Sequence, residues 1–148
     1  MSVKKIAVIV KSRSAADFLG SFFQNKKIYK PFYFQDAWAF LEYLMKHKPA
    51  AILVEDSFLP LIDDKTTRYP LIAIITGKLE KGLDRAITHH VDRYMYAPYF
   101  EKDLAYKLER IIIERNEFDS LKRELWELET GAEICRLISM TLDPKELL

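Results

Sequence analysis

The stretch HVDRYMYAPYFEKDLAYKLERII, residues 90–112, decides how this chain folds. Its aromatic run at 93–96 predicts a short strand, which ends at Ala97 and Pro98 because proline cannot donate a ladder hydrogen bond. From Glu101 onward, apolar residues recur every three or four positions, which predicts a helix. A strand followed by a turn and a helix is the building unit of an alternating α/β domain.

Four more strands are predicted upstream of this unit, from runs at 5–10, 29–34, 50–55 and 71–76. Most of these runs are apolar without alternation, which is typical of strands buried on both faces of a parallel sheet. The sequence therefore predicts one domain with a doubly wound parallel sheet. In such a fold, ligands bind at the carboxyl ends of the strands.

Helices are predicted between most of the strands. Ser14 and Asp36 are the expected N-caps of the first two, and the third carries an apolar stripe from Leu79 to Ile87. Between the third and fourth strands, the segment 57–70 contains two prolines and is predicted to form at most a short turn of helix. The third helix of the alternating pattern is therefore expected to be shortened or missing.

The composition disfavours several classes of protein. The chain has 148 residues, of which 49% are hydrophobic, and this is enough for one core. With 23 basic and 22 acidic side chains, it has no field that would attract nucleic acid or an anionic membrane. The single cysteine, Cys135, cannot form an internal disulfide, and no apolar run spans a bilayer. We expect a cytoplasmic protein that contacts neither nucleic acid nor a membrane directly.

The C-terminal part of the chain predicts a long helix with an apolar seam. Charged residues interleave with apolar residues that recur at steps near three and four, which favours pairing with a second copy. The alternative is a helix that folds back on its own domain, where its first half is expected to dock in either case. The expected seam residues of the homodimer are Leu104, Leu108, Ile111, Phe118, Leu125 and Leu128.

Three motifs resemble those of the receiver domain of bacterial response regulators, over about residues 4–115. EDSFLP at 55–60 resembles the family's Asp-x-x-x-Pro motif, and IITG at 74–77 resembles its Thr-Gly after the fourth strand. The stretch at 90–112 resembles its Gly-Ala-x-x-Tyr-Leu-x-Lys-Pro motif and the helix that follows. The resemblance implies a CheY-like, flavodoxin-like sheet of five strands in the order 2-1-3-4-5, which we assign to a domain at residues 1–115.

The resemblance also implies a phosphorylation site, which this sequence alters. In the family, two acids after the first strand bind magnesium, an aspartate after the third accepts a phosphoryl group, and a lysine precedes the final proline. Asp56 and Thr76 match the acceptor and a phosphate contact, but the acids fall on Lys11 and Ser12 and the lysine falls on Ala97. Cation and lysine normally neutralise the transferring phosphoryl group, so their loss predicts a degenerate receiver without a metal cofactor.

The sequence leaves open which carboxylate matches the phosphoryl acceptor, and it leaves open the role of Tyr94. Counting back from Pro60 selects Asp56, whereas counting forward from Pro49 selects Glu55, which would be a standing negative charge. Lys11 is expected to form a fixed ion pair with either carboxylate. Tyr94 falls on the family's switching aromatic position, although a half-buried packing residue is the simpler interpretation.

The tail ICRLISMTLDPKELL at 134–148 resembles the entry helix of GAF sensor domains. We therefore divide the chain into the receiver-like domain at 1–115 and a linker or coiled-coil helix at 116–148, with a possible start of a GAF domain. A plain amphipathic end helix is the alternative.

These observations are compatible with three functions. The first is a non-enzymatic signalling module that works through protein partners or a downstream domain and through a helix-mediated homodimer. The second is an atypical two-component regulator that is phosphorylated on Asp56 and uses Mg²⁺. The third, a flavodoxin-like cofactor enzyme, is disfavoured because four glycines in the whole chain leave no glycine-rich phosphate cradle.

Overall fold

The structure is a computed structural model, and it describes residues 3–66 and 69–127. The chain divides into two compact units, Met1–Ile112 and Ile113–Leu148. The first unit holds the whole sheet, and the described part of the second is the C-terminal portion of one long helix. The predicted GAF-like tail at 134–148 lies outside the described residues.

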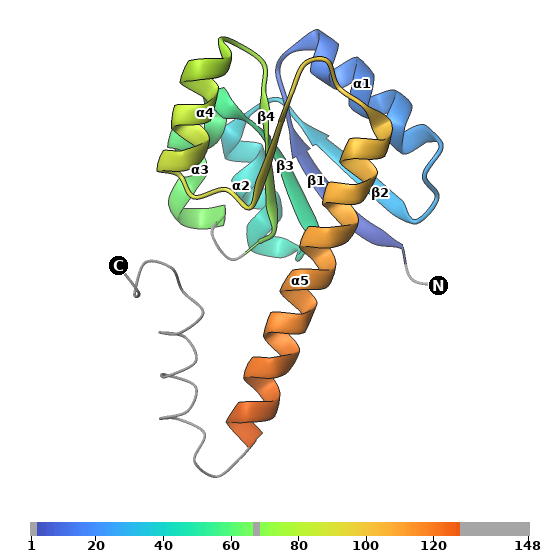
Figure 1. The fold of residues 1–148 in the computed structure, drawn as a ribbon, viewed down its shortest axis with the longest axis vertical. Helices are drawn as coiled ribbons and strands as arrows, with labels where there is room; N and C mark the ends of the chain where they lie inside the picture. Colours follow the sequence, from blue (N-terminus) through green and yellow to red (C-terminus); the bar gives the residue numbers. More distant parts are fainter. Residues whose placement is uncertain (1–2, 67–68, 128–148) are drawn as a thin grey trace. The chain divides into compact units, whose positions relative to one another are not determined.

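Five parallel strands form a single sheet in the order β2-β1-β3-β4-β5, which confirms the predicted fold (Figure 1). All four neighbouring pairs are parallel, so the carboxyl ends of the strands meet at one edge of the sheet. The predicted strand positions are confirmed to within about one residue at each end. The strands are β1 (Lys4–Ile9), β2 (Tyr29–Phe34), β3 (Ala51–Glu55), β4 (Leu71–Ile75) and β5 (Arg93–Tyr96).

Helices cover both faces of the sheet, as the continuous apolar strands predict. In β1, Ile6 and Val8 pack with residues of α1 and α5, whereas Ala7 and Ile9 pack with residues of α2, α3 and α4. The sheet therefore separates two apolar clusters, one against each helical layer. The helices are α1 (Arg13–Gln24), α2 (Ala37–Lys46), α3 (Leu59–Thr66), α4 (Leu79–Thr88) and α5 (Glu101–Glu127), with a 3-10 turn η1 (Asp56–Phe58) before α3.

One of the two predicted helix caps is confirmed and one is wrong. Asp36 caps α2, because its carboxylate accepts the N–H of Ala39 at 3.2 Å. Ser12, not Ser14, caps α1, with its hydroxyl 3.5 Å from the N–H of Ala15. The strand ends early enough for the helix to begin at Arg13, which places Ser14 inside the first turn.

The segment between β3 and β4 is more helical than the sequence predicts. The expected single turn is wrong, because α3 runs for 8 residues after η1. Pro60 occupies the second position of this helix, where no intrahelical partner exists for a backbone N–H, so the proline is tolerated. The helix remains short, and its inward residues Leu59 and Ile62 are buried against the sheet.

The first half of the expected dimer seam belongs to the domain core. Leu104, Leu108 and Ile111 are buried in the cluster formed with α1 and the sheet, so their assignment to a seam with a second copy is corrected. Apolar residues cannot serve both contacts at once. Of the remaining seam residues, Phe118 and Leu125 lie on the described part of the second unit, and Leu128 lies outside the described residues.

Candidate functional site

The predicted site residues lie where four strands end at one edge of the sheet. Lys11 and Ser12 follow β1, Glu55 and Asp56 stand at the end of β3, and Thr76 follows β4. Ala97 and Pro98 follow β5 and are joined by a cis peptide bond. The fold thus brings together residues that are up to 87 positions apart, counted from Lys11 to Pro98.

Glu55 is fixed by backbone groups at the start of α1. Its side chain is buried, and one carboxylate oxygen accepts the N–H of Lys11 at 3.1 Å and of Ser12 at 2.8 Å. The other oxygen accepts the hydroxyl of Ser57 at 2.7 Å. Three donors satisfy this carboxylate, which ties the end of β3 to the first turn of α1.

The expected ion pair of Lys11 is wrong. Lys11 contacts Glu55 through its backbone N–H, and among the described residues no carboxylate lies within ion-pair distance of its ammonium group. Its side chain is exposed. Lys11 therefore contributes a solvated positive charge near the mouth of the site.

Asp56 is held by β4 and α4. It is only 3% exposed, and its Oδ1 accepts the backbone N–H of Thr76 at 3.1 Å. The Thr76 hydroxyl is 3.4 Å from the same oxygen, which is long for a hydrogen bond between oxygens. Oδ2 accepts from Arg85 Nη1 at 3.1 Å and forms an ion pair with it. Arg85 is thus the cationic partner of Asp56 in this structure.

Arg85 is the functional residue that the sequence reasoning missed. It lies 29 positions beyond Asp56, on α4, and its side chain is 43% exposed while that of Asp56 is 4% exposed. Nothing in its local sequence marks it, because a basic residue in a helix is ordinarily a solvated surface group. The sequence offers only an indirect indication. Alanine stands at position 97, where the receiver family has lysine, so a buried Asp56 carboxylate needs a cation from elsewhere in the chain.

Tyr99 follows the cis peptide and contacts the end of β4. Its hydroxyl donates to the carbonyl of Ile75 at 3.0 Å, and its ring packs on Phe18 with centroids 5.3 Å apart. Burial raises the pKa of the Tyr99 phenol, and the negative charges of Glu55 and Asp56 raise it further. In the receiver family that the sequence resembles, a lysine occupies the position of Ala97. Here that position carries no charge, and the neutral phenol of Tyr99 lies two residues further along the chain.

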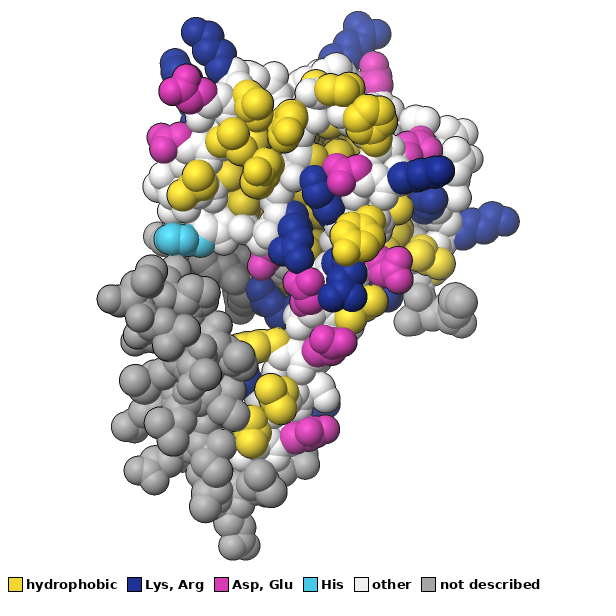
Figure 2. Space-filling view, in the orientation of Figure 1, with side chains coloured by type: hydrophobic (Ala, Val, Ile, Leu, Met, Phe, Trp, Pro, Cys, Tyr) yellow, Lys and Arg dark blue, Asp and Glu magenta, His cyan; other side chains and the backbone are white. Residues whose placement is uncertain are grey.

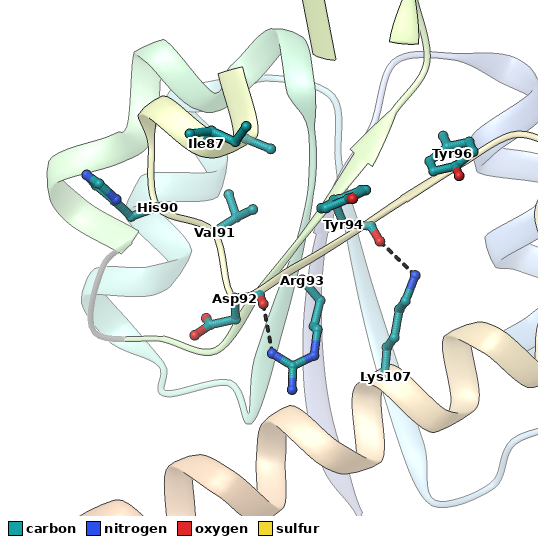
Figure 3. Close-up of a pocket in the computed structure, with 9 residues that line it drawn as sticks. Ile87, His90, Val91, Asp92, Arg93, Tyr94, Tyr96 and Lys107 are labelled. Atoms are coloured by element: carbon teal, nitrogen blue, oxygen red, sulfur yellow. Dashed lines mark hydrogen bonds between the residues drawn. The ribbon is translucent and has the colours of Figure 1, made fainter. Parts of the chain in front are cut away.

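Tyr94 lies away from these carboxylates, on the outer surface of β5. It is 42% exposed and stacks on Tyr96 with ring centroids 6.3 Å apart. Figure 3 shows both rings beside a surface hollow, where Lys107 reaches across from α5 and donates to the carbonyl of Tyr94 at 2.7 Å. The partial exposure of Tyr94 and its ring contact agree with the interpretation of a half-buried packing residue. A switching role for Tyr94 remains a prediction.

The described residues do not supply a cluster of metal ligands. Across 3–66 and 69–127, no group of three or more histidine, cysteine, aspartate or glutamate side chains could hold a metal ion. Glu55 and Asp56 are both engaged with protein donors. Within the same two ranges, no helix combines the length and the apolar character that crossing a membrane requires.

The comparisons with known proteins identify the fold. No protein-family model and no curated protein matches the chain. Full-length FixJ from B. japonicum is 15% identical, with a TM-score of 0.68 over 88% of this chain and 68% of that chain. The receiver domain of sensor histidine kinase PA1611 from Pseudomonas aeruginosa, with a coordinated magnesium ion, is 16% identical, with a TM-score of 0.64 over 75% and 98%.

A third structure extends the comparison. It represents redox sensors of the streptococci that evolved from two-component response regulators, and it is 18% identical, with a TM-score of 0.63 over 79% of this chain and 54% of that chain. Likeness at these identities establishes architecture. The chain therefore has the fold of a response-regulator receiver domain.

Proposed function

We propose that this chain is a receiver-like signalling module that acts through protein contacts without being phosphorylated and without catalysing a reaction. The observation that carries the proposal is the environment of Asp56, the residue that matches the phosphoryl acceptor of the receiver family. Its carboxylate is buried and already paired with Thr76 and Arg85. A phosphoryl acceptor has to present a carboxylate oxygen to the donor, and here each oxygen of Asp56 already accepts a hydrogen bond from a protein donor.

The chemistry around Asp56 supports the same proposal. Phosphoryl transfer needs a cation that bridges oxygens of the acceptor and of the phosphoryl group. Lys11 and Ser12 stand where the resembling family has its metal-binding acids, and Ala97 stands where it has lysine. An ammonium group carries charge but lacks the bridging coordination of Mg²⁺. We therefore expect no resident metal at this site.

Protein contacts are supported by an apolar surface on the first unit. Figure 2 shows hydrophobic side chains gathered over α4 and β5, with basic side chains beside them. Ile87 is 71% exposed, and Tyr94 and Tyr96 are 42% and 46% exposed. A contiguous apolar surface of this kind commonly marks a protein interface. The partner would be another signalling protein or a domain downstream of α5.

Dimerisation through α5 remains part of the proposal in reduced form. Phe118 and Leu125 are the described seam residues that the core does not use. Together with Leu128 they would form a short apolar contact with a second copy. A GAF domain after the helix and a cytoplasmic location without nucleic-acid or membrane contact complete the proposed setting.

The second candidate is a phosphorylatable regulator. It is favoured by one observation, the short distance from Asp56 Oδ1 to Thr76, whose backbone N–H lies at 3.1 Å and whose hydroxyl lies at 3.4 Å, so that acceptor and phosphate contact are adjacent. If Arg85 moved aside, one carboxylate oxygen of Asp56 would become available. Mg²⁺ would then be required.

A magnesium titration separates the two candidates. Amide chemical shifts around Asp56 and Thr76 are followed while Mg²⁺ is added, with Ca²⁺ and Na⁺ as controls for ionic strength. The proposal predicts no saturable shift below millimolar concentrations. Sub-millimolar binding that disappears in the Asp56→Asn variant would overturn it and favour the phosphorylatable regulator.

A further inference from the structure

Helix α2 has an apolar stripe on the side that faces away from the sheet. Its inward residues Phe40 and Leu44 are buried in the core. On the opposite side, Trp38 is 76% exposed and Met45 is 79% exposed. These two lie seven residues apart, which is about two helical turns, so they share one face, and the partly buried Leu41 lies between them.

This stripe is unusual for a monomer surface. Single exposed apolar residues need no explanation, but tryptophan is rarely left this open to water. Neighbouring apolar residues in the same stripe make a partner the more economical explanation. The stripe lies on α2, whereas the apolar surface with Ile87, Tyr94 and Tyr96 lies on α4 and β5, so the two are separate features of the domain.

The charges around the stripe are arranged along the helix. In the C-terminal half of the helix, Glu42 and Lys46 form an exposed ion pair at 3.3 Å, so these two charges offset each other. Asp36 stands exposed at the N-terminal end, and Lys46 and Lys48 stand exposed at the C-terminal end. The face is therefore acidic at one end, apolar in the middle and basic at the other.

We propose that a second copy of this chain covers the stripe, with the two α2 helices packed antiparallel across a two-fold axis. The axis would pass between positions 41 and 42, midway between Trp38 and Met45. Trp38 of one copy then lies opposite Met45 of the other, and contacts between methionine sulfur and aromatic rings are favourable. A two-fold interface requires such a self-complementary surface.

The charge pattern selects the antiparallel arrangement. It places Asp36 of one copy beside Lys48 of the other at both ends of the contact, close to the Lys46 that Glu42 already pairs. A parallel arrangement would place like charges together and would align the two helix dipoles unfavourably. The apolar centre and the charged ends therefore point to the same geometry.

This contact is independent of α5 and of the state of Asp56. A chain with one isologous contact at α2 and another at α5 would assemble beyond the dimer, because each copy would offer two different self-complementary surfaces. Failure of the α2 contact would leave the proposed signalling role intact, and failure of that role would leave the α2 contact intact.

Cysteine cross-linking of the full chain tests the arrangement. Trp38→Cys and Met45→Cys are made separately in a Cys135→Ser background, and each is oxidised alone and as a mixture. In the antiparallel contact, Trp38 of one copy lies about 10 Å from Trp38 of the other along the helix axis, and the same holds for the two Met45 residues. This distance is too long for a disulfide. The mixture should therefore yield a disulfide-linked dimer, and neither variant alone should yield one.

The other outcomes contradict the proposal. Cross-linking of each variant alone, without enhancement in the mixture, would indicate a parallel contact. Absence of any cross-link would show that the stripe is not covered by a second copy. Ile87→Cys, on the exposed side of α4, is the matched control and should not link to either variant.

A second measurement avoids cysteine. Sedimentation of the Leu125→Asp variant, in which the α5 contact is removed, should still show concentration-dependent dimerisation. Adding Met45→Glu should weaken that dimer by at least about tenfold, while adding Ile87→Glu should leave it unchanged. Equal effects of the two substitutions, or a monomer at every concentration before either is added, would overturn the α2 contact.

Discussion

Breaking the ion pair between Asp56 and Arg85 should cost measurable stability, and the structure indicates how much. The two charges are 3.1 Å apart, which corresponds to about 5 kcal/mol of attraction at an effective dielectric constant of about 20. Much of this is offset, because Asp56 loses its hydration and the Arg85 side chain is 43% exposed to screening water. We expect a net coupling of about 1–2 kcal/mol.

A double-mutant cycle measures this coupling. Asp56→Asn, Arg85→Gln and the double variant are unfolded in urea beside the parent, and the non-additive part of the free energy is the coupling. Asparagine keeps an oxygen that can accept the Thr76 N–H, so the cycle isolates the charge. The exposed pair of Glu42 and Lys46 is the control, with an expected coupling of about 0.3–0.5 kcal/mol. A coupling at Asp56 no larger than this control would refute the reasoning.

Three further predictions concern packing, titration and assembly. Gly82→Ala should lower the free energy of unfolding in urea by about 1–3 kcal/mol, because the added methyl would collide with the side chain of Ile75. Gly20→Ala meets no atom within 4 Å and should raise the free energy of unfolding by about 0.5–1 kcal/mol. A change of the same sign in both variants would contradict the packing. The raised pKa of Tyr99 means that stability from its neutral phenol is fully present below the unfolded pKa, about 10, and is lost as pH rises through the higher folded pKa. Tyr99→Phe should therefore lose less stability than the parent above pH 10, and identical alkaline profiles would count against the raised pKa of this partly buried phenol. Leu125→Asp should lower the average mass measured by light scattering, and an unchanged mass would remove α5 from the assembly.

The sheet could be predicted from the sequence because its signal is local and repeated. Continuous apolar runs such as 50–55 and 71–76 can only be satisfied by burial on both faces, and this dictates helices on both sides of a parallel sheet. Asp36 was predictable for the same reason, since a capping residue acts within three positions of itself.

The errors arose where neighbouring residues offered equivalent choices. The sequence Ser12-Arg13-Ser14 contains two possible caps, and only the end of β1 decides between them. The prolines of 57–70 predicted at most a short turn of helix, yet Pro60 lies in the first turn of α3, where a proline is tolerated. At Leu104 and Leu108, the same spacing fits a core-facing stripe and a dimer seam, and periodicity alone cannot separate them.

The sequence predicts which residues of the family's site are replaced, but it does not predict that Arg85 pairs with Asp56. Lys11, Ser12 and Ala97 are visible as departures from the resembling pattern. The partner of Asp56 is set by how α4 packs against the end of β3, a contact across 29 positions that leaves no trace in local sequence. Long-range pairs of this kind become visible only when the fold is known.

Intact-mass spectrometry after incubation with acetyl phosphate and Mg²⁺ tests the central claim most directly. The parent, the Asp56→Asn variant and the Arg85→Gln variant are compared under the same conditions. We predict that the parent gains no phosphoryl adduct, because its carboxylate is paired and its metal ligands are absent from the usual positions. An adduct of about 80 Da on the parent, labile to hydroxylamine and lost in Asp56→Asn, would contradict this account.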